Sequence, residues 1–196
     1  MRPYWIVAFG ALLAALFTAM LPLAEPSRAE QPPAAAQIGG PFGLTDQDGQ
    51  PVTEKDLLGK PSVIFFGFTL CPDICPTTLL EMTNWLKALG PDADKLNVFF
   101  VSVDPEDTPE RMKLYLSSFD PHIRGLTGSE AQIQQIARAY NVYYRRFPLK
   151  EGGHTYDHSA TVYALDKNGN HVGFLPNEAP PAVAAAGLRD LIAGKQ

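Results

Sequence analysis

The two cysteines of this chain, Cys71 and Cys75, lie four positions apart in the sequence CPDICP, and each directly precedes a proline. A residue before proline is pushed out of the helical region, so we do not expect the pair to be neighbours on a regular helix. We place Cys75 near the N-cap of a helix that begins at Pro76, where the free N–H groups and the helix dipole favour thiolates. The pair therefore indicates disulfide exchange, a soft metal or a structural disulfide. The last would contribute only about 2 kcal/mol for so short a loop.

Histidine is the natural third ligand for a metal held by two thiolates. Among the four histidines, His158 stands out because it lies in the sequence DHS, immediately before a predicted strand over residues 161–165. Thiolates favour Cu(I), zinc or iron–sulfur clusters, and imidazole suits copper and zinc. A structural zinc site needs a fourth ligand, which the sequence does not offer in an obvious place. Three ligands fit Cu(I) best, and Cu(II) is compatible if an oxygen atom completes a more planar arrangement.

Three carboxylates are candidates for orienting the histidine or adjusting the charge of the site, with a solvated loop position as the alternative for each. These are Asp73, Asp104 and Asp157. The remaining histidines are expected to be solvated loop residues: His122, His154 and His171.

The cysteine pair must be positioned by the strand that precedes it, residues 63–68. This continuous run of β-branched and aromatic residues is typical of a strand covered on both faces. A second buried strand, residues 96–103, follows a helix of about a dozen residues, and such a crossover makes the two strands parallel. The cysteines therefore come to the carboxyl end of a central strand, where ligands gather in open α/β sheets.

Turn and capping signals complete the order of elements. Two Asx-Gly dipeptides predict β-hairpins, at 48–49 and at 168–169. Capping residues predict helices over 108–119, 129–140 and 181–193, and a short strand is expected over 142–146. The predicted fold is a thioredoxin-like three-layer α/β/α sandwich with an added N-terminal β-hairpin. In this plan His158 faces the cysteine loop across the end of the sheet.

Three segments together resemble the signature segments of the Sco/SenC family. They are GFTLCPDICP at 67–76, VDPEDT at 103–108 and DHS at 157–159. The resemblance extends from about residue 41 to residue 192 and implies a thioredoxin-like domain that binds one copper ion, here through Cys71, Cys75 and His158. It also implies a metallochaperone that delivers copper to the dinuclear copper site of cytochrome c oxidase or reduces the cysteines of that site. The implied partners are the copper-site subunit of the oxidase, other copper chaperones and thiol reductases.

The N-terminus sets the expected compartment. Residues 4–23 carry no charge and follow Arg2, and twenty helical residues span roughly 30 Å, the thickness of a bilayer core. We expect an uncleaved membrane anchor, with a cleaved signal peptide as the alternative because the Ser-Arg-Ala sequence at 27–29 resembles a cleavage site. The charge of Arg2 predicts a bacterial inner-membrane protein whose domain faces the periplasm. The chain thus divides into an anchor (1–24), a flexible tether (25–40) and a copper-binding domain (41–196).

Composition and motif spacing restrict the other functions. The net charge of −5 and the lack of a basic stripe exclude a nucleic-acid partner. An exported thiol–disulfide oxidoreductase, with Cys71 and Cys75 as its redox pair, is the alternative to a chaperone. Such enzymes generally use Cys-x-x-Cys, which is one residue shorter than the spacing here. His158 also has no evident role in thiol–disulfide exchange. A peroxiredoxin-type peroxidase is disfavoured, because the threonine expected three residues before its cysteine is replaced by Phe68 or Pro72.

Overall fold

The computed structural model describes residues 38–195, so the predicted anchor and most of the predicted tether lie outside the described residues. The strands are β1 (Gly43–Asp46), β2 (Pro51–Thr53), β3 (Ser62–Gly67), β4 (Asn97–Ser102), β5 (Ile123–Thr127), β6 (Tyr144–Pro148), β7 (His154–His158), β8 (Val162–Leu165) and β9 (His171–Leu175). The α-helices are α1 (Ile74–Leu89), α2 (Pro109–Leu116), α3 (Glu130–Ala139) and α4 (Pro181–Ile192). Short 3-10 helices cover Glu54–Leu57 and Gly90–Lys95.

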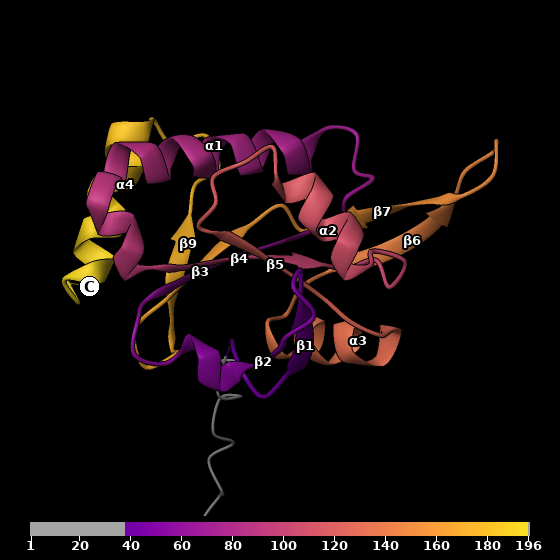
Figure 1. The fold of residues 1–196 in the computed structure, drawn as a ribbon, viewed down its shortest axis with the longest axis horizontal. Coiled ribbons are helices and arrows are strands. Elements are labelled where there is room, and N and C mark those ends of the chain that lie inside the picture. Colours follow the sequence, from indigo (N-terminus) through magenta and orange to yellow (C-terminus); the bar gives the residue numbers. More distant parts are fainter. Residues whose placement is uncertain (1–37, 196) are drawn as a thin grey trace, which may run out of the picture. The chain divides into compact units, whose positions relative to one another are not determined.

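The main sheet has the strand order β2-β1-β5-β4-β3-β8-β9 (Figure 1). Its central strands β3 and β4 are parallel, as predicted, with Val63 opposite Val98 and Phe66 opposite Val101. Every residue of β3 is buried. Helices α1 and α4 lie along one side of the sheet and α3 along the other (Figure 1). The continuous apolar runs of the central strands are thus covered on both faces, which confirms the predicted three-layer sandwich.

The two predicted hairpins are confirmed at the edges of this sheet. Strand β1 pairs antiparallel with β2, and β8 pairs antiparallel with β9. Helices α3 and α4 occupy their predicted positions, whereas α2 ends at Leu116, before the predicted end at residue 119. Within residues 38–195, no helix combines the length and the apolar character needed to cross a bilayer.

Strand β5 was not predicted from the sequence. It runs parallel to β4 and lies between β4 and β1. Arg124 interrupts its apolar pattern, but Nη2 of this residue donates to Asp46 Oδ2 at 2.6 Å across the sheet. Gly125 allows α2 to pack closely, because a Cβ atom there would lie 2.6 Å from Leu116 and 2.8 Å from Met112. A buried strand with a paired charge and a glycine does not show as an apolar run.

The β6–β7 hairpin forms a second, two-stranded sheet that reaches away from the main one (Figure 1). The predicted short strand at 142–146 corresponds to β6, shifted along the chain. The segment that ends at His158 is strand β7, and its first residue is His154, which was expected in a loop. Tyr144 lies opposite His158, and Pro148 lies opposite His154 near the hairpin tip. His158 therefore occupies the end of β7 that is farthest from the tip.

Candidate metal centre

The cysteine loop joins the end of β3 to the start of α1. The chain turns after Phe68, whose carbonyl accepts a hydrogen bond from Cys71 N–H at 3.3 Å. Helix α1 begins at Ile74, so Cys75 lies in its first turn and Pro76 is its third residue. The prediction of a helix start at Pro76 is therefore wrong by two residues. Proline is tolerated at this point because the first four N–H groups of a helix have no acceptor within it.

The position of Cys75 depends on Gly67, the last residue of β3. A Cβ atom at residue 67 would lie 2.6 Å from Cys75 Sγ and 2.8 Å from the ring of Phe100 on β4. A larger residue would therefore displace the thiol or the ring. Cys75 is 0% exposed and Cys71 is 9% exposed. Glycine at this position lets the Cys75 thiol pack directly against the central strands.

The two free thiols form a hydrogen-bonded pair. Cys75 N–H donates to Cys71 Sγ over 3.4 Å. A hydrogen bond from the Cys75 thiol lowers the pKa of Cys71 to about 4. The same contact, together with burial, raises the pKa of Cys75. The metal-free pair therefore holds a thiolate on Cys71 and a proton on Cys75 at neutral pH, and a metal bound by both sulfurs would release that proton.

His158 approaches the cysteines from the last position of β7. Its Nε2 lies 3.3 Å from Cys75 Sγ, and its ring packs against Phe65 and Phe68. Its Nδ1 lies 3.1 Å from the carbonyl oxygen of Ser159. Because a carbonyl oxygen only accepts, Nδ1 donates this bond and Nε2 is the ring nitrogen that faces the thiols. A hydrogen bond from the other ring nitrogen is the arrangement that is typical of a metal-binding histidine.

The structure brings the three predicted ligands together. One ligand atom from each of Cys71, Cys75 and His158 lies within 4.8 Å of the other two. Two sulfur atoms and an imidazole nitrogen are the donor set that suits Cu(I), and imidazole also suits Cu(II). The donor types, the orientation of the histidine ring and the burial of the thiols therefore fit a copper ion.

Asp104 is close to this group but does not contact His158. Its Oδ2 lies 2.8 Å from Nε2 of His154, and its Oδ1 accepts a hydrogen bond from Tyr156 OH at 3.3 Å. The ring of His158 is instead held by the backbone carbonyl of Ser159. A backbone acceptor of this kind leaves no signal in the sequence.

The other two predicted carboxylates are exposed. Asp73 is the N-cap residue of α1 and makes no capping hydrogen bond with its side chain. Its backbone N–H donates to Cys71 and helps to lower the pKa of that thiol. Asp157 lies on the face of β7 opposite to that of His158 and is paired in register with Arg145.

Asp107 is a supporting residue that the sequence reasoning did not single out. It is buried and accepts hydrogen bonds from Thr69 N–H at 2.9 Å, from Thr69 Oγ1 at 2.5 Å and from Ser102 Oγ at 2.6 Å. Thr69 lies two residues before Cys71, so Asp107 ties the cysteine loop to the end of β4. The sequence did offer a signal for this role, because Asp107 is the second aspartate of the DPED sequence that follows the predicted strand at 96–103.

The other three histidines lie outside the cysteine–histidine group. The prediction of a solvated loop residue is wrong for His154, whose side chain is only 8% exposed. His122 lies between Asp120 and Asp94, and its hydrogen bonds to both carboxylates raise its pKa. The prediction is also wrong for His171, which is the first residue of β9 and whose pKa is lowered by burial.

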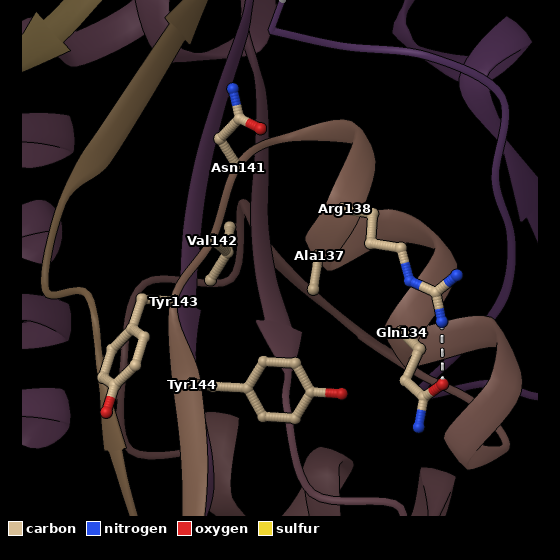
Figure 2. A pocket seen from close by; sticks show the side chains of 7 residues that line it. All are labelled: Gln134, Ala137, Arg138, Asn141, Val142, Tyr143 and Tyr144. Atoms are coloured by element: carbon tan, nitrogen blue, oxygen red, sulfur yellow. Dashed lines mark hydrogen bonds between the residues drawn. The ribbon is translucent and has the colours of Figure 1, made fainter.

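A separate hollow of about 310 Å³ lies where α3 ends and β6 begins (Figure 2). Arg138 donates to Gln134 Oε1 at 3.0 Å on one side of it, and the rings of Tyr143 and Tyr144 lie on the other (Figure 2). The carbonyl of Tyr143 accepts a hydrogen bond from Ser159 N–H at 2.9 Å. The hollow therefore borders the base of the hairpin that carries His158, but it contains none of the predicted ligands.

Comparisons with protein sequences identify a family. The family model described as SCO1/SenC matches residues 30–193. The chain is 42% identical over 142 residues to Protein SCO2, mitochondrial, of Saccharomyces cerevisiae, and the match covers 70% of this chain and 47% of that protein. It is 42% identical over 139 residues to an SCO2-like protein of Rickettsia prowazekii, covering 69% of this chain and 68% of that protein. The chain thus spans about half the length of the yeast relative.

Solved structures agree with the sequence match. ScoI of Bradyrhizobium japonicum with copper bound is 52% identical, with a TM-score of 0.76 over 79% of this chain and 99% of that one. Yeast Sco1 with copper bound is 36% identical, with a TM-score of 0.71 over 79% of this chain and 87% of that one. These neighbours confirm the predicted thioredoxin-like fold. On the sequence match and the shared fold together, the chain belongs to the SCO1/SenC family.

Proposed function

We propose that this protein is a copper chaperone that holds one copper ion through Cys71, Cys75 and His158. The observation that carries the proposal is the approach of two thiol sulfurs and a ring nitrogen of His158 to within 4.8 Å of one another. Support comes from the Bradyrhizobium and yeast relatives whose structures contain copper. Cu(I) is the preferred cargo because two thiolates bind it well, and Cu(II) is bound when the imidazole takes part.

The recipient that we propose is the copper-site subunit of cytochrome c oxidase. Support comes from the signature segments at 67–76, 103–108 and 157–159, whose resemblance to the Sco/SenC family implies this recipient. Residues 1–24 would anchor the chain in the bacterial inner membrane, and the domain would then meet the oxidase subunit on the periplasmic side. Other copper chaperones or thiol reductases would load or reduce the site.

Transfer by ligand exchange suits the surface around the site. Cys75 is fully buried, but Leu70 on the cysteine loop is 61% exposed and Ile74 at the start of α1 is 39% exposed. A partner can therefore dock directly over the loop. A partner thiolate would displace His158 first and then one sulfur at a time, so that copper stays bound throughout. The Cys75 sulfur then recovers the proton that it lost on loading.

Reduction of the recipient's cysteines is a second candidate function, favoured by the Cys71 thiolate. The pKa of Cys71 is about 4, so this sulfur is a thiolate at neutral pH. It would attack a partner disulfide and form a mixed disulfide, with one partner thiolate leaving. Cys75, after losing its proton, would then displace the second partner thiolate and form the Cys71–Cys75 disulfide. Two electrons pass to the partner, and the protein is left oxidised.

A transfer assay with the full-length chain in detergent tests both candidates. The reduced, copper-loaded chain is mixed with the copper-site domain of an oxidase subunit, and copper is measured in each protein after separation. We expect copper to move to the recipient, with Cys75→Ser as the control that cannot be loaded. In a parallel arm, the reduced metal-free chain is mixed with the oxidised recipient, and free thiols are counted. Copper retention by the loaded chain would reject the chaperone, and unchanged recipient thiols would reject the reductase.

A further inference from the structure

A polar cluster outside the candidate metal centre connects the β6–β7 hairpin to the loop after β4. Arg146 Nη2 donates to Glu106 Oε1 at 2.7 Å and to His154 Nδ1 at 2.8 Å. His154 Nε2 lies 2.8 Å from Asp104 Oδ2, and Tyr156 OH donates to Asp104 Oδ1 at 3.3 Å. We call the four residues Asp104, Glu106, Arg146 and His154 the latch.

The hydrogen bonds fix the protonation of His154. A guanidinium group can only donate, so His154 Nδ1 must accept from Arg146. The ring proton is therefore on Nε2, which donates to the carboxylate of Asp104. The buried Asp104, which is 0% exposed, thus gains a donor from the hairpin in addition to the Glu106 N–H at 3.0 Å on its own loop. A buried carboxylate without such partners would be costly, so the contact favours the docked hairpin.

The same cluster satisfies the spacing of a metal site, since ligand atoms of Asp104, Glu106 and His154 lie within 4.8 Å of one another. However, Arg146 already supplies the cation, at hydrogen-bond distance from two of these three residues. The arrangement is therefore complete as a network of protein groups. Its role must lie in what it holds together.

What the latch holds is the strand that carries the histidine ligand. Residues 154, 156 and 158 share one face of β7, and four strand residues span about 13 Å. The ring of Tyr156 packs between His154 and Phe68, with centroid distances of 5.3 Å to each, and Phe68 packs on His158. The main-sheet ladders do not include β6 or β7. The latch and this aromatic row therefore both dock the hairpin on the rest of the domain.

We propose that the latch is a positioning device that keeps His158 over the cysteines, and that opening it selectively weakens Cu(II) binding. This inference rests on the proposed copper site. Cu(I) can remain on the two thiolates when the histidine leaves, whereas Cu(II) depends on the imidazole. The apparent affinity for a ligand falls in proportion to the population of the competent conformation. An open latch would therefore lower Cu(II) affinity and ease the exchange of the histidine for a partner's ligand.

Arg146→Ala and His154→Phe test the inference in the full-length chain. His154→Phe keeps an aromatic ring against Tyr156 but removes the hydrogen bonds. Arg145→Ala is the matched control, because Arg145 precedes Arg146 on the same strand and lies over the Phe147 ring, 4.9 Å from its centroid. We expect both latch variants to bind Cu(II) about tenfold more weakly, with Cu(I) affinity within twofold of wild type. The control is expected to match wild type for both ions.

Two further measurements separate positioning from general destabilisation. In the His158→Ala background, Arg146→Ala should cause no additional loss of Cu(II) affinity, because the latch acts through His158. In the metal-free protein, amide hydrogen exchange should become faster in β6 and β7 for Arg146→Ala and not for Arg145→Ala. Unchanged Cu(II) affinity in the latch variants, or an equal loss without His158, would overturn the inference. If the wild-type chain binds no copper, the proposed function fails instead.

Discussion

The two halves of the candidate copper site are built in different ways. The cysteine loop is part of the core: Cys75 is fully buried, and Asp107 ties Thr69 to β4. The histidine half lies on the β6–β7 hairpin, outside the main sheet. In β6, every residue except the first is exposed. A two-stranded hairpin is marginally stable unless it packs against something else. The thiols therefore have a fixed geometry, whereas the imidazole depends on contacts that dock the hairpin.

This difference suggests how one site can both hold and release copper. The fixed pair of sulfurs retains Cu(I) by itself, and the hairpin adds or withdraws the third ligand. Changes in the cysteine half should thus affect both oxidation states of copper. Changes in the histidine half should affect Cu(II) in particular.

The largest effect is expected for Cys75→Ser, which removes one of the two thiolates. Structural zinc sites gain about 10–16 kcal/mol from four ligands, so one ligand is worth roughly 3 kcal/mol or more, a loss of about 100-fold or greater in affinity. Competition titrations with Cu(I) and with Cu(II) measure this loss of affinity. Retention of wild-type Cu(I) affinity would show that Cys75 is not a ligand.

Gly67→Ala should disturb the cysteine half without removing a ligand. The added methyl group would lie 2.6 Å from Cys75 Sγ, and overpacking of this kind costs about 1–3 kcal/mol in the free energy of unfolding. Denaturant unfolding of the metal-free chain measures this cost, and Cu(I) and Cu(II) affinity should fall together. The control is Gly43→Ala in β1, where a Cβ atom meets nothing within 4 Å. Equal stability of the two variants would contradict the close contact.

A pH titration of thiolate absorbance tests the charge of the metal-free pair. Because the pKa of Cys71 is lowered to about 4, the thiolate should persist at neutral pH and disappear only as the pH falls through about 4. Cys75→Ala removes the donor that stabilises it, so the midpoint should rise toward the ordinary value of a thiol. An unshifted midpoint in Cys75→Ala would show that this hydrogen bond is not the cause.

The smallest effect is expected for Asp157→Asn, although this residue precedes His158. Its side chain is exposed and lies on the other face of β7. Exposed substitutions of this kind usually change the free energy of unfolding by no more than about 0.5 kcal/mol. Cu(II) affinity should stay within twofold of wild type. A tenfold loss would mean that the carboxylate supports the site directly.

Most of the fold was predictable because its signals are local. The apolar runs of β3 and β4 and the Asp-Gly and Asn-Gly turns each specify one element and its neighbour. Strand β5 was not visible because Arg124 is satisfied by Asp46, a contact between residues 78 positions apart. Strand β7 was not predicted because its residues are polar or aromatic without an apolar run, and because it pairs outside the main sheet.

The ligand residues were predictable from their types and motif spacing, but their support was not. The Ser159 carbonyl that orients His158 is a backbone group and is invisible in a sequence. His154 was expected to be a solvated loop residue, yet its side chain contacts Asp104, which is distant in sequence and adjacent in space. Contacts of this kind arise only when the hairpin docks on the loop after β4.

The most direct test of the account is an anaerobic titration of the reduced full-length chain with Cu(I) and, separately, with Cu(II), for wild type and His158→Ala. We predict one copper ion per chain for both oxidation states in wild type. His158→Ala should lower Cu(II) affinity by about 100-fold and Cu(I) affinity by less than about tenfold, because the fixed thiolate pair remains. Equal losses for the two ions would contradict the division of the site into a fixed and a docked half.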